Sequence, residues 1–166
     1  MTKVVPMALG IILKQLVEEY LAEMEWDELV EIDQGSLATK TDMKVSYNGQ
    51  IYRLFIETDP GKSWIEVYLY SDHKVPAGRM SVACLLANRI NRRTYNGYIA
   101  AVGAEDGFQF KQVMDIAGCN ITTLAIHNMV DSGFELMEHW GSKMDLVCNS
   151  IIELDPMDGC ISPAVS

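Results

Sequence analysis

The spacing of apolar and polar residues predicts a helix at the start of the chain. Apolar side chains recur every three or four positions from Leu9 to Met24, and Lys, Gln and Glu residues fill the opposite side. Pro6 falls near the first turn, where a helix tolerates proline, and we expect helical character to fade near Trp26. The apolar stripe is expected to lie on a sheet.

Residues 29–70 change to the alternation that is typical of β-strands. The pattern predicts strands at 29–32, 36–47, 50–58 and 64–70. Asn48-Gly49 and Asp59-Pro60-Gly61 are turn sequences, so we expect an antiparallel meander. The third strand should turn one set of residues to the core: Tyr52, Leu54, Ile56 and Thr58. The fourth should leave an amphipathic, aromatic set on the other face: Trp64, Glu66, Tyr68 and Tyr70.

Residues 75–115 predict a helix followed by a β-hairpin. The helix, at 78–93, has one face made of Met80, Ala83, Leu86, Ala87 and Ile90, and we expect Val82, Cys84 and Leu85 to widen this face. Asn96-Gly97 ends the helix. The hairpin strands are predicted at 98–103 and 108–114, joined by a turn at 104–107. A last helix is predicted from a cap at Asn120 to about Met144.

This order of elements predicts an α+β fold. An antiparallel sheet, consisting of a meander and a hairpin, packs with helices in the order α-β-β-β(-β)-α-β-β-α. We expect a single domain over residues 1–144. Residues 145–166 show no sustained period and are predicted to form an acidic C-terminal extension.

The charge of the chain argues against two classes of partner. The formal net charge is −10, which opposes binding to nucleic acid and to anionic membranes. The apolar run 4–13 contains Pro6 and Gly10 and is too short to span a membrane, so we expect neither a signal peptide nor an anchor. The four cysteines form no CxxC pair and have no zinc-type spacing, which indicates reduced thiols and a cytoplasmic protein.

The sequence shows no motif for catalysis or for a cofactor. It has no nucleophile elbow, phosphate-binding loop or dinucleotide-binding glycine motif, so we predict no catalytic residue and no cofactor. His127 with Asp131, and Glu135 with His139, have the i,i+4 spacing at which a helix can present two metal ligands. Two ligands do not make a site, and we predict no metal.

The densest positive charge lies in the run 89–93, and it supplies the candidate partner-binding residues Arg89, Arg92, Arg93 and Tyr95. Guanidinium groups beside a tyrosine suit an acidic peptide or a phosphate group. The alternative is that these cations only complement the dipole at the end of a helix. The aromatic face of the fourth strand and the methionines of the last helix are further candidate partner surfaces.

The central stretch resembles the YbjN domain family of bacteria. Val75-Pro76 opens a helix, Asn88-Arg89-Ile90-Asn91 matches an asparagine pair late in that helix, Gly97 opens the next strand, and Asp106-Gly107 matches an acidic-glycine turn. The order of elements extends the resemblance to about residues 7–144. It implies a fold similar to that of type III secretion chaperones, and it supplies no catalytic or binding residue. Asn88 and Asn91 are expected to cap the helix or bridge to the sheet.

The resemblance implies a non-enzymatic domain, similar to sensory transduction regulators and to dimeric secretion chaperones that hold segments of a partner. Our hypothesis is a cytoplasmic homodimer that binds another protein, as a regulator or a chaperone-like adaptor. The alternative is a small-ligand receptor or an enzyme, with a pocket between the sheet and the last helix.

Overall fold

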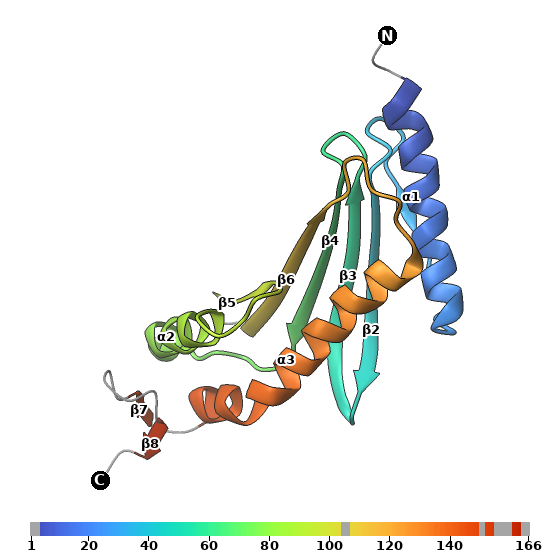
Figure 1. Ribbon diagram of the computed structural model, residues 1–166. Coiled ribbons are helices and arrows are strands. Elements are labelled where there is room, and N and C mark those ends of the chain that lie inside the picture. The colour runs from blue at the N-terminus through green and yellow to red at the C-terminus, as the bar shows by residue number, and fades with distance from the viewer. Residues whose placement is uncertain (1–3, 104–106, 150–151, 155–160, 164–166) are drawn as a thin grey trace.

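The computed structural model describes residues 4–103, 107–149, 152–154 and 161–163. A six-stranded antiparallel sheet is covered on one face by α1 (Val4–Glu23) and α3 (Thr123–Asn149) (Figure 1). A shorter helix, α2 (Met80–Asn91), follows the 3-10 turn η1 (Ala77–Arg79) and packs beside the end of the sheet. The predicted α+β fold is confirmed.

The strand order in the sheet is β1-β2-β3-β4-β6-β5. The first four strands form the predicted meander, with these bounds: β1 (Glu31–Ile32), β2 (Thr39–Tyr47), β3 (Gln50–Asp59) and β4 (Trp64–Ser71). The hairpin strands are β5 (Tyr98–Gly103) and β6 (Gly107–Asp115). The later strand β6 pairs with β4, so β5 becomes one edge of the sheet.

Alternation along the strands separates a core face from an open face. The predicted core set of β3 is confirmed, because Tyr52, Leu54, Ile56 and Thr58 are all buried. In β4, Ile65, Val67 and Leu69 are buried, and the aromatic set lies on the other face. Asn48 and Gly49 have φ values of 48° and 80°, as the tight turn between β2 and β3 requires.

The two long helices close the core. α1 buries Leu13, Val17 and Tyr20 against β2 and β3, as its stripe predicted. Ile12, which the apolar spacing placed on the same stripe, is exposed instead. α3 contacts β4 and β6, and its closest approach is at Gly133. A Cβ atom there would lie 2.8 Å from the ring of Phe110, which is fully buried. The ring therefore fills the space beneath the middle of α3.

Two predictions about α2 and α3 were wrong. Cys84 and Leu85 are exposed and do not widen the buried face of α2, which consists of Ala83, Leu86, Ala87 and Ile90. Met80 and Val82, also predicted on this face, are partly buried and pack against the core. Asn120 does not cap the last helix. α3 begins at Thr123, where the N–H of Ala125 bonds the carbonyl of Thr122 at 3.0 Å.

The last helix is also longer than predicted. It continues past Met144 to Asn149, because Val147 and Cys148 extend its buried stripe. Beyond it, β7 (Ile152–Leu154) pairs with β8 (Ile161–Pro163) in a separate two-stranded ribbon. Most of the predicted turn at 104–107 lies outside the described residues, and the division into a domain and an acidic extension stays a prediction.

Candidate functional site

The end of α2 forms one side of a surface hollow of about 410 Å³. Four consecutive residues after the helix face three polar residues and one leucine on α3; the lining consists of Arg93, Thr94, Tyr95, Asn96, Ser132, Glu135, Leu136 and His139. Of the four predicted partner-binding residues, the hollow includes Arg93 and Tyr95. Arg92 is exposed and Arg89 is half-buried, and neither lines the hollow.

Hydrogen bonds hold this segment in place. Thr94 donates its hydroxyl to the carbonyl of Ile90 at 3.0 Å, and the N–H of Arg93 bonds the same carbonyl at 2.9 Å. Gly97 then turns with a φ of 74°, and a Cβ there would lie 2.5 Å from the ring of Phe110. Only glycine fits this turn, which fixes where the Arg93–Asn96 segment meets β5.

The side chain of Asn91 bonds to the outer edge of β5 at Ile99. Its amide nitrogen donates to the carbonyl of Ile99 at 2.8 Å, and its amide oxygen accepts from the N–H of Ile99 at 2.7 Å. These two backbone groups point away from β6, so the amide takes the place of a neighbouring strand. The expected bridging role of Asn91 is confirmed, whereas Asn88 is exposed.

Arg93, in the lining of the hollow, and Arg92, outside it, carry positive charge at the end of α2. Among the described residues, no ion pair involves Arg92 or Arg93, and Tyr95 is 100% exposed. On the other side of the hollow, Glu135 and His139 lie one turn apart on α3. An acidic group of a partner entering here would meet Arg93 at once and would have to avoid Glu135.

The open face of the sheet has aromatic rings, but its cations cover them. Lys40 and Arg53 lie 4.9 and 4.7 Å from the ring centroid of Phe55, which is only 8% exposed although no helix covers it. Lys111 lies 4.7 Å from the Tyr68 ring, and Lys62 lies 5.2 Å from the Trp64 ring. Ion pairs such as Arg53 with Asp42 at 2.6 Å hold the cations there. Charged groups therefore cover the aromatic rings, and this face is hydrophilic and poorly suited to an apolar partner.

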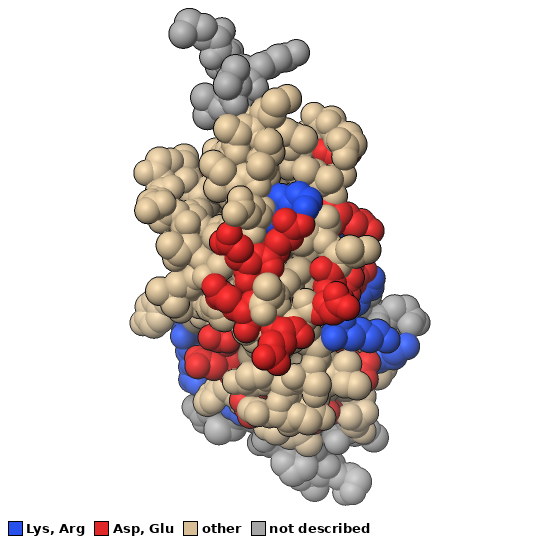
Figure 2. Space-filling view, turned by 90° about the vertical axis from the view of Figure 1, so that its right-hand side faces the viewer, with Lys and Arg blue, Asp and Glu red and all other residues tan. Residues whose placement is uncertain are grey.

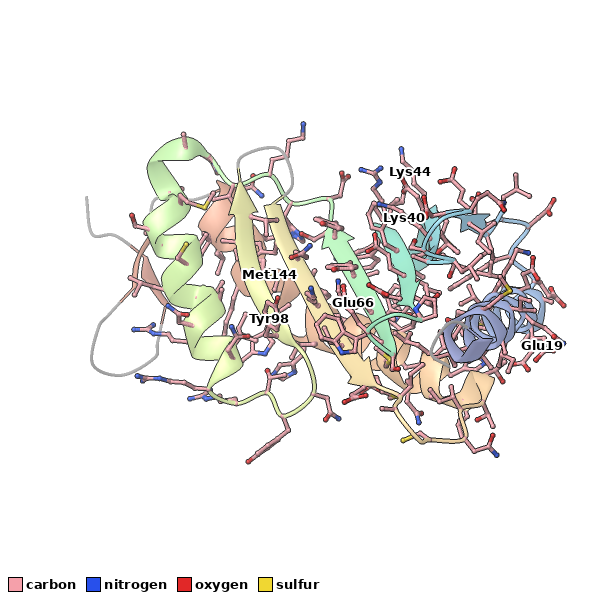
Figure 3. The ribbon with its side chains drawn as sticks, turned by 90° about the horizontal axis from the view of Figure 1, so that it is seen from above. Glu19, Lys40, Lys44, Glu66, Tyr98 and Met144 are labelled. Carbon is pink, nitrogen blue, oxygen red and sulfur yellow. The ribbon has the colours of Figure 1, made fainter. Side chains whose placement is uncertain are left out.

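At its other edge the sheet is unpaired over most of β2. β1 pairs only with Thr39 and Lys40, so residues 41–47 have a neighbouring strand on the β3 side alone among the described residues. Tyr47 and Gln50 flank the two-residue turn and form a hydrogen-bonded pair. In an antiparallel ladder such pairs alternate with pairs that are not hydrogen-bonded, so every second residue of β2 turns its N–H and C=O groups away from β3. The backbone groups of Asp42, Lys44 and Ser46 consequently point outward. Figure 3 shows Lys40 and Lys44 on the side of the sheet away from α1, the helix that carries Glu19.

A second hollow is formed mainly at the ends of β3 and β4 that lie near each other, and Lys44 is its one lining residue from β2. It measures about 290 Å³ and is formed by Lys44, Ile51, Tyr52, Arg53, Tyr70, Ser71 and Asp72. Ile51 is 58% exposed there. The unpaired edge and this hollow were not predicted from the sequence.

His127, from one of the two candidate metal pairs, makes its contacts within the protein. Its Nε2 lies 2.9 Å from the Glu23 carboxylate, and no group of three potential metal ligands occurs in the described part of the chain. Phe110 and Met129, both fully buried, fill the middle of the layer between the sheet and α3, where the alternative hypothesis expected a pocket. Within the described ranges, no helix combines the length and apolarity needed to cross a membrane.

No protein-family model matches the chain, and no curated protein matches its sequence. Solved structures do match its fold. SchA in the HopA1–SchA chaperone–effector complex has a TM-score of 0.56 at 13% identity, over 80% of this chain and 95% of that chain. The ExsC–ExsE complex gives a TM-score of 0.58 at 9% identity, over 82% of this chain and 96% of the matched chain.

YbjN from E. coli is a third match, with a TM-score of 0.51 at 8% identity over 78% of this chain and 92% of that chain. At such identities the likeness shows the fold and nothing more. The chain has the YbjN-like fold of type III secretion chaperones, as its central stretch predicted.

Proposed function

We propose that this chain is a non-enzymatic cytoplasmic adaptor, a regulator or chaperone-like protein that binds an extended segment of another protein. The unpaired edge of β2 is the observation that carries this proposal. Backbone N–H and C=O groups need partners, and an extended segment that adds as a strand supplies them. The likeness to SchA and to the ExsC–ExsE complex supports a protein as the ligand.

The residues around the edge suit strand addition. In this proposal the hollow that Lys44 borders receives a side chain of the partner, since pockets for side chains give such sites their specificity. Lys40 and Lys44 also discourage two copies of β2 from pairing by accident, because like charges would meet. Arg92, Arg93 and Tyr95 form a second contact in this proposal, for an acidic part of the same partner.

A substitution at Lys44 tests strand addition directly. In Lys44→Pro the outward N–H is lost, whereas the bonds from β2 to β3 remain because the N–H of Lys44 does not take part in them. Lys44→Ala is the matched control, since it removes the same charge and keeps the N–H. We expect protein captured from extract of the native host to be retained by wild type and Lys44→Ala and lost from Lys44→Pro.

The outcome distinguishes the edge from other surfaces. Equal capture by the proline and alanine variants, both folded by circular dichroism, would contradict strand addition at β2. Capture that is lost only in Arg92→Glu/Arg93→Glu would place the contact at the end of α2 instead. If the wild type enriches no protein, the adaptor function itself fails.

We also propose a homodimer that forms through α2. The outward side of this helix presents Cys84 and Leu85, and Leu85 is 51% exposed in the middle of the helix. In this proposal Leu85 packs against the same helix of a second copy.

A further inference from the structure

The solvent-facing side of α1 has an apolar first half and an acidic second half. Met7, Ile11 and Ile12 are 59%, 58% and 60% exposed, although they are large apolar residues on one helix. Glu18 and Glu19 follow on the same side two turns later. The opposite side of α1, with Leu13 and Val17, already makes the contacts to the sheet.

The fold gives no reason for the exposed apolar ridge formed by Met7, Ile11 and Ile12. Single exposed apolar residues are ordinary, but three neighbours on one helix are typical of a contact surface. Helix-forming residues with polar side chains would serve the helix equally well at these positions. The ridge therefore suits a partner that covers it.

The negative charge next to the ridge indicates which kind of partner can bind there. Residues 15–36 contain eight carboxylates and no Lys or Arg. Figure 2 shows acidic side chains gathered on the face of the molecule that α1 presents, with uncharged residues above them. The nearest cation on α1, Lys14, is already paired with Glu18. An anionic membrane, a nucleic acid or the α1 face of a second copy would each bring negative charge to this face, and all three are disfavoured.

We propose that the outward face of α1 binds an amphipathic, basic helix of a partner protein. The partner helix has apolar residues at one end, which cover Met7, Ile11 and Ile12. Its Lys or Arg residues follow about 10 Å further along, because Ile12 and Glu19 are seven residues apart at 1.5 Å per residue. Helices bind helices in this way through apolar anchors at i, i+3 and i+4.

This inference rests on the proposed function, since it names the chemistry of a protein partner. It concerns a different surface from the edge of β2. A basic helix on α1 and an extended segment on β2 can belong to one partner chain, but each contact is tested by its own variants.

The test uses a labelled helical peptide of about 18 residues, long enough to form a helix on contact. Leucines occupy i, i+3, i+4 and i+7 in its first half, and lysines occupy the same face of its second half. Binding to the full chain is measured by fluorescence anisotropy at low and high salt. A second peptide has glutamate in place of each lysine.

Two double variants address the two halves of the site. Ile11→Ser/Ile12→Ser removes the ridge, and Glu18→Lys/Glu19→Lys reverses the charge. The controls are Val113→Ser, at an exposed apolar residue on β6, and Glu138→Lys, on α3. All these positions are exposed, so the fold is expected to persist, which circular dichroism and thermal melting verify.

We expect each double variant to weaken binding of the lysine peptide about tenfold or more, and the controls to leave it unchanged. Added salt should weaken it, and the glutamate peptide should not bind. No binding to the wild type, equal binding to the double variants, or equal binding of both peptides would overturn the proposal. If strand binding still depends on Lys44 in that case, only the α1 site fails and the proposed function stands.

Discussion

Glu23 links the end of α1 to the start of α3. Its Oε1 accepts the hydroxyl of Thr123 at 3.0 Å, and its Oε2 lies 2.9 Å from Nε2 of His127. The ring of His127 meets the buried ring of Tyr20 edge-on, with centroids 4.7 Å apart. The hydrogen bond from His127, followed by that from Thr123, lowers the pKa of the Glu23 carboxyl.

Because the pKa of Glu23 is lowered in the folded state, the contribution of this carboxylate to the free energy of unfolding depends on pH. The stabilisation from Glu23 is present above its ordinary pKa of 4.5 and is lost as the pH falls through the lower value of the folded state. We expect Glu23→Gln to lower the free energy of unfolding near pH 7, and the difference from wild type to vanish near pH 3. Urea titrations at a series of pH values measure it, with Glu25→Gln as the control on the following loop. A difference that stays constant with pH would contradict the role of the carboxylate.

At the scale of elements, two glycines of α3 allow the effect of core packing on stability to be distinguished from the effect of helix propensity. Gly133 faces Phe110, and a Cβ there would come within 2.8 Å of the ring. Gly141 is also inside the helix, but apart from its chain neighbours and the nearby backbone of the same helix, a Cβ there would have no atom within 4 Å. Both sites are helical, so any difference between the two alanine variants in stability comes from the contacts of the added methyl group.

We expect Gly133→Ala to destabilise the protein by about 1–3 kcal/mol, because the ring of Phe110 has to leave its place in the core. Gly141→Ala should stabilise it by about 0.5–1 kcal/mol, since alanine favours a helix and nothing obstructs the added methyl group. Thermal and chemical unfolding measure both. If both variants shift stability in the same direction, the close approach of α3 to the sheet is not as described.

The elements themselves were largely predictable from the sequence. Alternation in residues 50–70 and the Asn48-Gly49 turn define β2 to β4, because strand period and turn chemistry are local properties. The faces of α2 were less predictable. Cys84 and Leu85 are apolar, and apolarity alone does not tell whether a side chain meets the core or stands at the surface. Asn120 resembled a cap, but Thr122 and Thr123 follow it and the helix starts there.

The candidate site was predictable only in part. The cluster of arginines was visible in the sequence, but the approach of Glu135 and His139 to Arg93 depends on how α3 crosses the sheet. The unpaired edge of β2 depends on which strand ends the sheet, and the order of strands is not a local property. Asn91 was linked to bridging through a family resemblance, because an asparagine near a helix end has several possible partners.

At the scale of the whole molecule, the proposed dimer can be tested by one exposed leucine. Leu85→Asp places a charge on the outward side of α2, and Leu29→Asp is the control because Leu29 is 81% exposed on a distant loop. We expect a dimer for wild type and Leu29→Asp, and a shift of at least tenfold toward monomer for Leu85→Asp. Analytical ultracentrifugation over a range of concentrations measures the equilibrium. A wild-type monomer at all concentrations would refute the dimer.

The amide of Asn91 makes the two edges of the sheet unequal. The β5 edge is already occupied by a side chain of the same molecule, while the β2 edge is unoccupied along residues 41–47 among the residues that the structure describes. Sheets that stack into fibres need a free edge at both ends, so that every added unit offers a new one. A strand can add along β2, whereas at β5 an incoming strand would first have to displace the Asn91 amide from Ile99. In a growing strand polymer we therefore expect the molecule to hinder addition of the next unit, and so to slow an aggregating partner at the point where it joins.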